Sequence, residues 1–123
     1  MAIDHVTIKV KDLAKAKAFY AAALAPLGYK VHMEWAGKFI VPGEHRPDLW
    51  LALYEVTAPP AHVAIAGGTK EKVDAFHDAA LKAGGKDNGH PGTRAEYHAG
   101  YYGAFILDPE GNNLEAVIHN YQG

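Results

Sequence analysis

The chain contains no cysteine. This absence excludes disulfide bonds, thiolate nucleophiles and sulfur-ligated metal sites, so any bound metal must have nitrogen and oxygen ligands. No apolar run approaches the roughly 20 residues that a membrane-spanning helix needs. Neither charge is in excess, because 12 Lys and Arg stand against 14 Asp and Glu and give a net charge of −2. We therefore expect a cytoplasmic protein with a small-molecule partner, which binds neither nucleic acid nor membrane.

What the sequence does contain is an internal repeat. The segment DHVTI begins at Asp4, and AHVAI begins 57 positions later at Ala61. When the window 4–30 is aligned with its copy without a gap, ten residues are identical. A chain of 123 residues can bury one core but not two. The two copies must therefore share a core.

Both copies have the same order of predicted elements. The first contains a strand, a helix that Asp12 caps, and three further strands, at 3–10, 13–25, 29–35, 38–41 and 48–55. The second opens with a strand at His62 and a helix capped by Thr69, and it ends with strands at 101–107 and 113–119. Residues 86–100 show too little alternation for a strand and predict a long loop. The predicted fold is α+β, one domain (1–123) of two βαβββ modules (3–56 and 61–119).

Histidines occupy the same point of both repeats, and a carboxylate lies on the last strand. His5 and His62 begin equivalent strands, which a pseudo-twofold axis would bring together. Glu115 alternates with apolar neighbours and so lies on the face opposite the core. Two imidazoles and a carboxylate suit a divalent ion, so we predict one ion of iron, manganese, zinc or nickel bound by these three residues. The alternative is that the histidines only bond to neighbouring backbone.

A substrate pocket is predicted beside this site. Matching Leu51-Ala52-Leu53 to Leu114-Glu115-Ala116 places Ala52 opposite Glu115, which predicts an open coordination position. The predicted substrate-binding residues are those on the open faces of the strands and one loop cation suited to a carboxylate or phosphate, namely Thr7, Trp50, Tyr54 and Arg94. The alternatives are that the aromatic residues only fill the curved sheet and that the arginine is solvated.

The acid or base of a reaction is not assigned by the sequence. Tyr97, His98, Tyr101 and Tyr102 cluster next to Arg94, and Tyr97, His98 and Tyr102 are the candidates. Gly100 and Gly103 can mark bulges, so the alternation of the sequence does not assign these side chains to one face of the sheet. Three other histidines are expected to have no functional role: His32, His45 and His77.

Four segments resemble the vicinal oxygen chelate superfamily: DHVTI from residue 4, AHVAI from 61, AFY from 18 and LDPEGNNLE from 107. This superfamily includes glyoxalase I, extradiol dioxygenases, fosfomycin-resistance enzymes, methylmalonyl-CoA epimerase and bleomycin-resistance proteins. The resemblance implies paired βαβββ modules that form a curved mixed sheet around a central cleft, with His5, His62 and Glu115 as metal ligands. Glyoxalase I has a fourth ligand where this chain is matched to Ala52. The three-ligand set is more similar to the fosfomycin enzymes and extradiol dioxygenases.

Two functions follow from these features. The first is a metal-dependent enzyme in which the ion chelates neighbouring oxygens of a small substrate, with lyase, isomerase, thiol-transfer and dioxygenase chemistry all open. The second is a metal-free protein that sequesters a small molecule between aromatic walls, as bleomycin-resistance proteins do. We also expect a homodimer, because the sheet edges of so short a chain are usually paired or covered.

Overall fold

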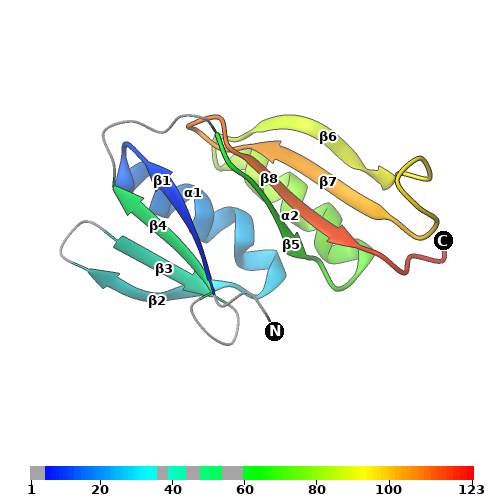
Figure 1. Ribbon diagram of the computed structural model, residues 1–123, viewed down its shortest axis with the longest axis horizontal. Helices are drawn as coiled ribbons and strands as arrows, with labels where there is room; N and C mark the ends of the chain where they lie inside the picture. The colour runs from blue at the N-terminus through cyan, green and yellow to red at the C-terminus, as the bar shows by residue number, and fades with distance from the viewer. Residues whose placement is uncertain (1–4, 36–38, 44–47, 54–59) are drawn as a thin grey trace.

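The computed structural model of the protein describes residues 5–35, 39–43, 48–53 and 60–123, which form two successive βαβββ modules (Figure 1). Module one consists of β1 (Val6–Val10), α1 (Leu13–Leu24), a 3₁₀ turn (Ala25–Leu27), β2 (Lys30–Trp35), β3 (Phe39–Gly43) and β4 (Leu49–Leu53). Module two consists of β5 (His62–Ala66), α2 (Lys70–Lys82), β6 (Lys86–Thr93), β7 (Tyr102–Leu107) and β8 (Asn113–Ile118). The predicted α+β fold of two repeated units is confirmed.

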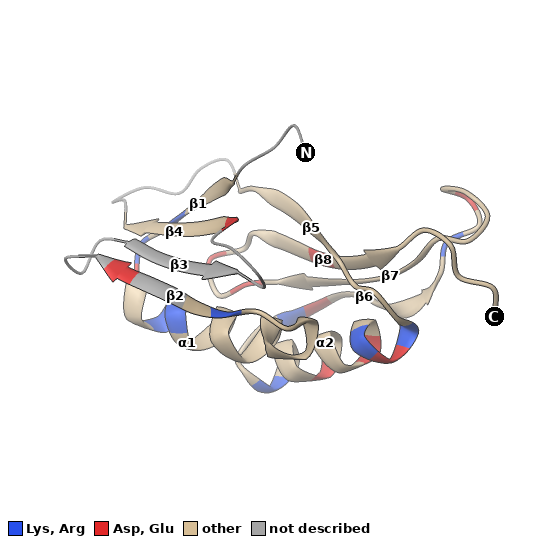
Figure 2. Cartoon of the chain, turned by 90° about the horizontal axis from the view of Figure 1, so that it is seen from below, with Lys and Arg blue, Asp and Glu red and all other residues tan. Residues whose placement is uncertain are grey.

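Each module has its own four-stranded sheet with the same topology. The strand orders are β1-β4-β3-β2 and β5-β8-β7-β6. In each sheet the first strand pairs in parallel with the last, and the other neighbours are antiparallel. Both helices cover the same side of the two sheets (Figure 2), which leaves the opposite side as an open face. β1 and β5 are both edge strands, and they run in opposite directions (Figure 1).

Local sequence explains which side of each strand is covered. In β1 the side chains of Ile8 and Val10 are buried under the helices, whereas Thr7 and Lys9 are exposed on the open face. The helices begin at their predicted caps, because the side chains of Asp12 and Thr69 accept backbone N–H groups at 3.0 and 3.2 Å. No helix in the described ranges is long and apolar enough to cross a membrane.

One hydrophobic core joins the two modules. The buried apolar residues of both modules form a single cluster, and α1 packs against α2. A polar contact reinforces this joint, since the buried Tyr20 hydroxyl donates to Asp108 Oδ2 at 2.7 Å. The turn between β7 and β8 also reaches the start of α1, where the Glu110 carboxylate accepts the backbone N–H groups of Lys11 and Asp12. The buried residues and these polar contacts thus connect the two modules.

The predicted loop at 86–100 is only partly a loop. Residues 86–93 form β6, which pairs with β7 and has register shifts on both sides of Gly89. Each shift inserts an extra residue and resets the alternation of side chains. The prediction of a loop was wrong for this stretch because bulges remove the period-two pattern on which strand recognition relies. The remaining part, 94–101, is irregular and borders the open face of module two.

Candidate functional site

A histidine and a buried carboxylate meet on the open face of module two. In the parallel pairing of β5 with β8, Ala64 lies opposite Glu115, and His62 is two residues earlier on the same face. Its Nε2 atom lies 2.9 Å from Glu115 Oε1. The side chain of Glu115 is only 5% exposed, whereas that of His62 is 54% exposed. The pair thus joins a sheltered carboxylate to an imidazole that is about half exposed.

Tyr101 fixes the other oxygen of this carboxylate. Its hydroxyl donates to Glu115 Oε2, and the ring crosses the sheet at Gly103, where a Cβ atom would lie 3.0 Å from Tyr101 Cε1. Glycine at this position leaves room for the ring. Burial and then the neighbouring Glu115 carboxylate raise the pKa of Tyr101. The phenol therefore stays protonated at neutral pH and acts as a hydrogen-bond donor.

A cation over an aromatic ring borders one side of the pair. The ring of Phe105 lies 6.3 Å from that of His62, and the guanidinium carbon of Arg94 lies 5.5 Å above Phe105. Arg94 donates to the carbonyl groups of His90 and Thr93 at 2.8 and 3.3 Å, which holds it in place. These contacts give the rim of the site a fixed positive charge.

A pair of hydrogen-bonded imidazoles borders the other side. His98 Nε2 lies 2.9 Å from His119 Nδ1, and the two rings are stacked. His98 Nδ1 lies 2.7 Å from the carbonyl oxygen of Ala99 and must donate to it. When both rings are neutral, His119 therefore donates from Nδ1 and presents Nε2 as an acceptor. Both imidazole rings form T-shaped contacts with the ring of Tyr101. The ring centroid of Tyr97 lies 4.9 Å from that of Tyr101, also in a T-shaped contact.

Module one has an aromatic residue where module two has the carboxylate. Thr7 pairs with Trp50 in the same register in which Ala64 pairs with Glu115, so Trp50 is the repeat mate of Glu115. The prediction that Ala52 is this mate was wrong by two residues, because Leu49, and not Leu51, corresponds to Leu114. The strand face was correct. The ring of His5 lies 5.0 Å from that of Trp50, just as His62 lies beside Glu115.

Some of the predicted site residues do not meet in one chain. Among the described residues, only His77, Asp87 and His90 form a group of three whose ligand atoms all lie within 4.8 Å of one another. His5 is exposed at the start of β1 and does not form such a group with His62 and Glu115. Tyr54 and the side chain of His32 lie outside the described residues, as does His45.

The candidate Tyr102 faces the helices. Its hydroxyl donates to Asp74 Oδ1 on α2 at 2.6 Å, and its ring packs against Tyr121. Its neighbour Tyr101 therefore faces the open side, as strand alternation requires. Sequence reasoning did not select Phe105 or His119. The alternation of Tyr101, Gly103 and Phe105 against buried Ala104 and Ile106 is the signal that identifies the open face of β7.

A separate hollow lies at the joint between the modules. Its volume is about 360 Å³, and its walls come from the start of α1 and the 108–110 turn. The polar groups of this turn hold the turn itself together, since Asp108 accepts hydrogen bonds from Glu110, Asn112 and Tyr20. We therefore assign the hollow to the module joint and not to the site at Glu115.

Known proteins share this architecture over nearly the whole chain. The family described as Glyoxalase/Bleomycin resistance protein/Dioxygenase superfamily matches residues 2–116. A glyoxalase/bleomycin resistance protein from Albidiferax ferrireducens T118 is similar with a TM-score of 0.80 and 26% identity, over 95% of this chain and 98% of the other. A lactoylglutathione lyase from Agrobacterium tumefaciens has a TM-score of 0.67 and 20% identity, over 94% and 92%. At that identity the likeness concerns the fold alone. No curated protein matches the sequence.

Proposed function

Since the chain belongs to the Glyoxalase/Bleomycin resistance protein/Dioxygenase superfamily, we propose that it is a metal-dependent enzyme that acts on a small substrate with two neighbouring oxygen atoms. The proposed ligands of its single catalytic ion are His5, His62 and Glu115. The observation that carries this proposal is the buried Glu115 carboxylate on the open face, with His62 Nε2 at 2.9 Å from Oε1.

The chemistry of the pair fits a divalent cation. Imidazole nitrogen and carboxylate oxygen are common ligands for zinc, iron, manganese and nickel. A carboxylate buried on an otherwise open face costs free energy unless hydrogen bonds or a cation compensate it. Tyr101 orients the oxygen that faces away from His62, which is the usual arrangement around a ligating carboxylate. A bound ion would supply Lewis acidity that stabilises negative charge on a substrate oxygen.

The third ligand is proposed to come from a second copy of the chain. His5 does not reach His62 and Glu115 in one chain, because β1 and β5 run in opposite directions at the edges of separate sheets. A twofold dimer that pairs module one of one copy with module two of the other would use these edges. It would place the partner's His5 near His62 and Glu115, and Trp50 would line the fourth side of the site.

The remaining residues have proposed roles in binding and proton transfer. Arg94 is fixed over Phe105 and would anchor an anionic group of the substrate. Trp50, beside His5, would supply an aromatic wall to the same pocket. The His98–His119 pair would accept a proton at His119 Nε2, since its other nitrogen positions are already engaged in hydrogen bonds. The site thus supports reactions in which an anion develops next to a cation and a base.

Elemental analysis of untagged protein tests the proposal. His62→Ala and Glu115→Gln are each expected to lower the metal content by about one equivalent per chain relative to wild type. His119→Ala is the matched control, since it removes an imidazole of the same face that is not a proposed ligand. An unchanged metal content in His62→Ala and Glu115→Gln would contradict the proposal and favour a metal-free binding protein.

A further inference from the structure

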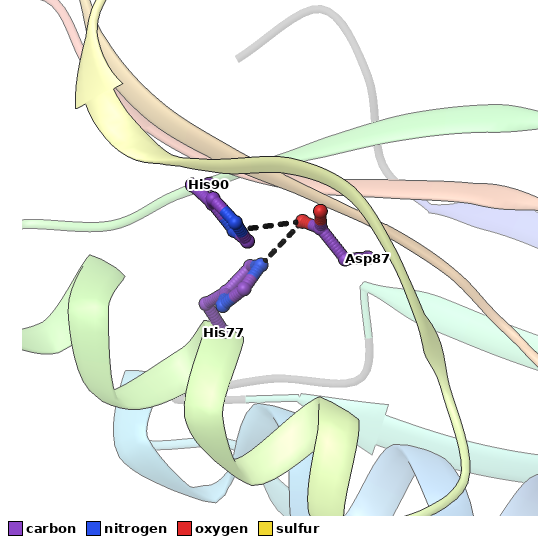
Figure 3. Close-up of side chains that lie close together, drawn as sticks. All are labelled: His77, Asp87 and His90. Carbon is purple, nitrogen blue, oxygen red and sulfur yellow. Dashed lines mark hydrogen bonds and ion pairs between the residues drawn. The ribbon is translucent and has the colours of Figure 1, made fainter.

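A second cluster of ligand-type side chains lies on the helix-covered side of module two. It consists of His77 on α2 with Asp87 and His90 on β6 (Figure 3). Asp87 Oδ1 lies 2.8 Å from His77 Nε2 and 3.2 Å from His90 Nδ1. The ligand atoms of the three residues all lie within 4.8 Å of one another. Glu115 faces the opposite side of the same sheet, so this cluster is distinct from the site described above.

The irregular shape of β6 creates the cluster. Residues three apart in a regular strand face opposite sides, which would separate Asp87 from His90. In β6 one extra residue falls between Asp87, which pairs with Ile106, and Gly89, which pairs with Phe105. This bulge resets the alternation, so that both side chains face α2. A buried position of α2 then supplies the third side chain, His77.

The three side chains differ in how far they are buried. The imidazole of His77 is 8% exposed and forms the floor, while Asp87 and His90 are 40% and 78% exposed and form the mouth. Ligand atoms that surround one zinc ion at about 2.0–2.2 Å are separated by roughly 3.4 Å. The distances from Asp87 to the two imidazoles are close to this spacing. A small shift of side chains would therefore accommodate an ion, and the exposed mouth leaves a coordination position for water.

We propose that His77, Asp87 and His90 form a second divalent transition-metal site, with two nitrogen ligands and one oxygen ligand of the type that binds zinc. Such an ion would tie α2 to β6. The same segment supports the open face, because the carbonyl oxygen of His90 accepts a hydrogen bond from Arg94 Nη2 at 2.8 Å. An ion at this site would hold the backbone that positions Arg94. The site acts as a structural support and needs no ligand from a second copy.

Zinc and cobalt titrations of the full-length Glu115→Gln variant test this site apart from the first one. The expected result is saturable binding of about one Zn²⁺ per chain and a visible Co²⁺ absorption band. Adding His90→Gln or Asp87→Asn is expected to weaken binding by more than about tenfold. Both side chains are at the mouth of the site, so these variants should fold.

The matched control is Asp78→Asn, which removes an exposed carboxylate of α2 that pairs with Lys82 and lies outside the cluster. It should keep the affinity of the Glu115→Gln background. Absence of saturable binding in that background would overturn the proposal. So would equal affinities in His90→Gln, Asp87→Asn and Asp78→Asn, because the three side chains would then form only a hydrogen-bonded cluster. Both outcomes would leave the proposed function intact, since it rests on His62 and Glu115.

Discussion

At the scale of single residues, the two repeats differ most at one position of their last strands. Glu115 and Trp50 occupy equivalent register positions. Glu115 lies beside His62, the first residue of β5, and Trp50 lies beside His5, which precedes β1. Module two therefore has a ligand-type pair, and module one has an imidazole next to an aromatic ring. In the proposed dimer this difference would give a pocket with one carboxylate and one aromatic wall, which would suit a three-ligand metal site with room for a substrate.

The register makes a prediction about a fourth ligand. Trp50→Glu should place a second carboxylate beside His5 and increase the rise in melting temperature that added Zn²⁺ or Mn²⁺ produces. Ala52→Glu is the matched control on the same strand face. Ala52 is 1% exposed, so a glutamate there should destabilise the fold by several kcal/mol, on the order of 3. The matching of Trp50 to Glu115 would be contradicted if added metal raised the melting temperature of Ala52→Glu more than that of wild type but had no such effect on Trp50→Glu.

The second prediction at this scale concerns Tyr101. Tyr101→Phe removes the donor to buried Glu115 Oε2. The free energy of unfolding should fall by about 1–3 kcal/mol, and the affinity for the metal should fall by about 10-fold to 100-fold. Tyr97→Phe is the control, because Tyr97 is 59% exposed and contacts Tyr101 through its ring, which the substitution keeps. Denaturant unfolding and metal titration measure the two quantities. If both substitutions changed the free energy of unfolding and the metal affinity equally, this role of Tyr101 would be refuted.

At the scale of elements, the sequence predicts most of the fold and less of the site. The helices and the regular strands follow from alternation, caps and the repeat, so their positions agree within a few residues. The Glu115 face also follows, because Leu114 and Ala116 flank it on a regular strand. β6 could not be predicted, because its two register shifts erase the alternation. The pairing of β4 with β1 is a tertiary property, which explains why Ala52 was matched where Trp50 belongs.

The joint between α1 and the β7–β8 turn predicts a pH effect. Burial and then the Asp108 carboxylate raise the pKa of Tyr20 well above its ordinary value. Its contribution to stability is therefore complete below about pH 10 and is lost as the pH rises above that value. Tyr20→Phe should lower stability by about 1.5–3 kcal/mol at pH 7, because it removes a hydrogen bond to a carboxylate.

Urea unfolding between pH 7 and 11 measures this effect. The difference in stability between wild type and Tyr20→Phe should shrink above pH 10, since only wild type ionises Tyr20 on unfolding. Tyr102→Phe provides a comparison at a less buried tyrosine that also donates to a carboxylate, Asp74. A constant difference between wild type and Tyr20→Phe across this pH range would contradict the buried hydrogen bond.

At the scale of the whole molecule, two similar sheets each expose an edge strand next to the proposed site. β1 and β5 are these edges, and exposed edges are usually covered in native proteins. We predict a homodimer. Light scattering should give about twice the chain mass of 13.2 kDa at micromolar concentration. A mass near that of one chain would contradict the prediction.

The proposed metal site contains ligands from two copies, and mixing two defective variants tests this arrangement. His5→Ala and His62→Ala would each be prepared with His90→Gln, so that the second proposed site does not contribute. Each variant alone should bind little metal. After unfolding and refolding together in equal amounts, about a quarter of the wild-type metal content should return, because half of the dimers are mixed and each of these has one intact site. If the refolded mixture binds no more metal than the separate variants, ligands from two copies do not form the site.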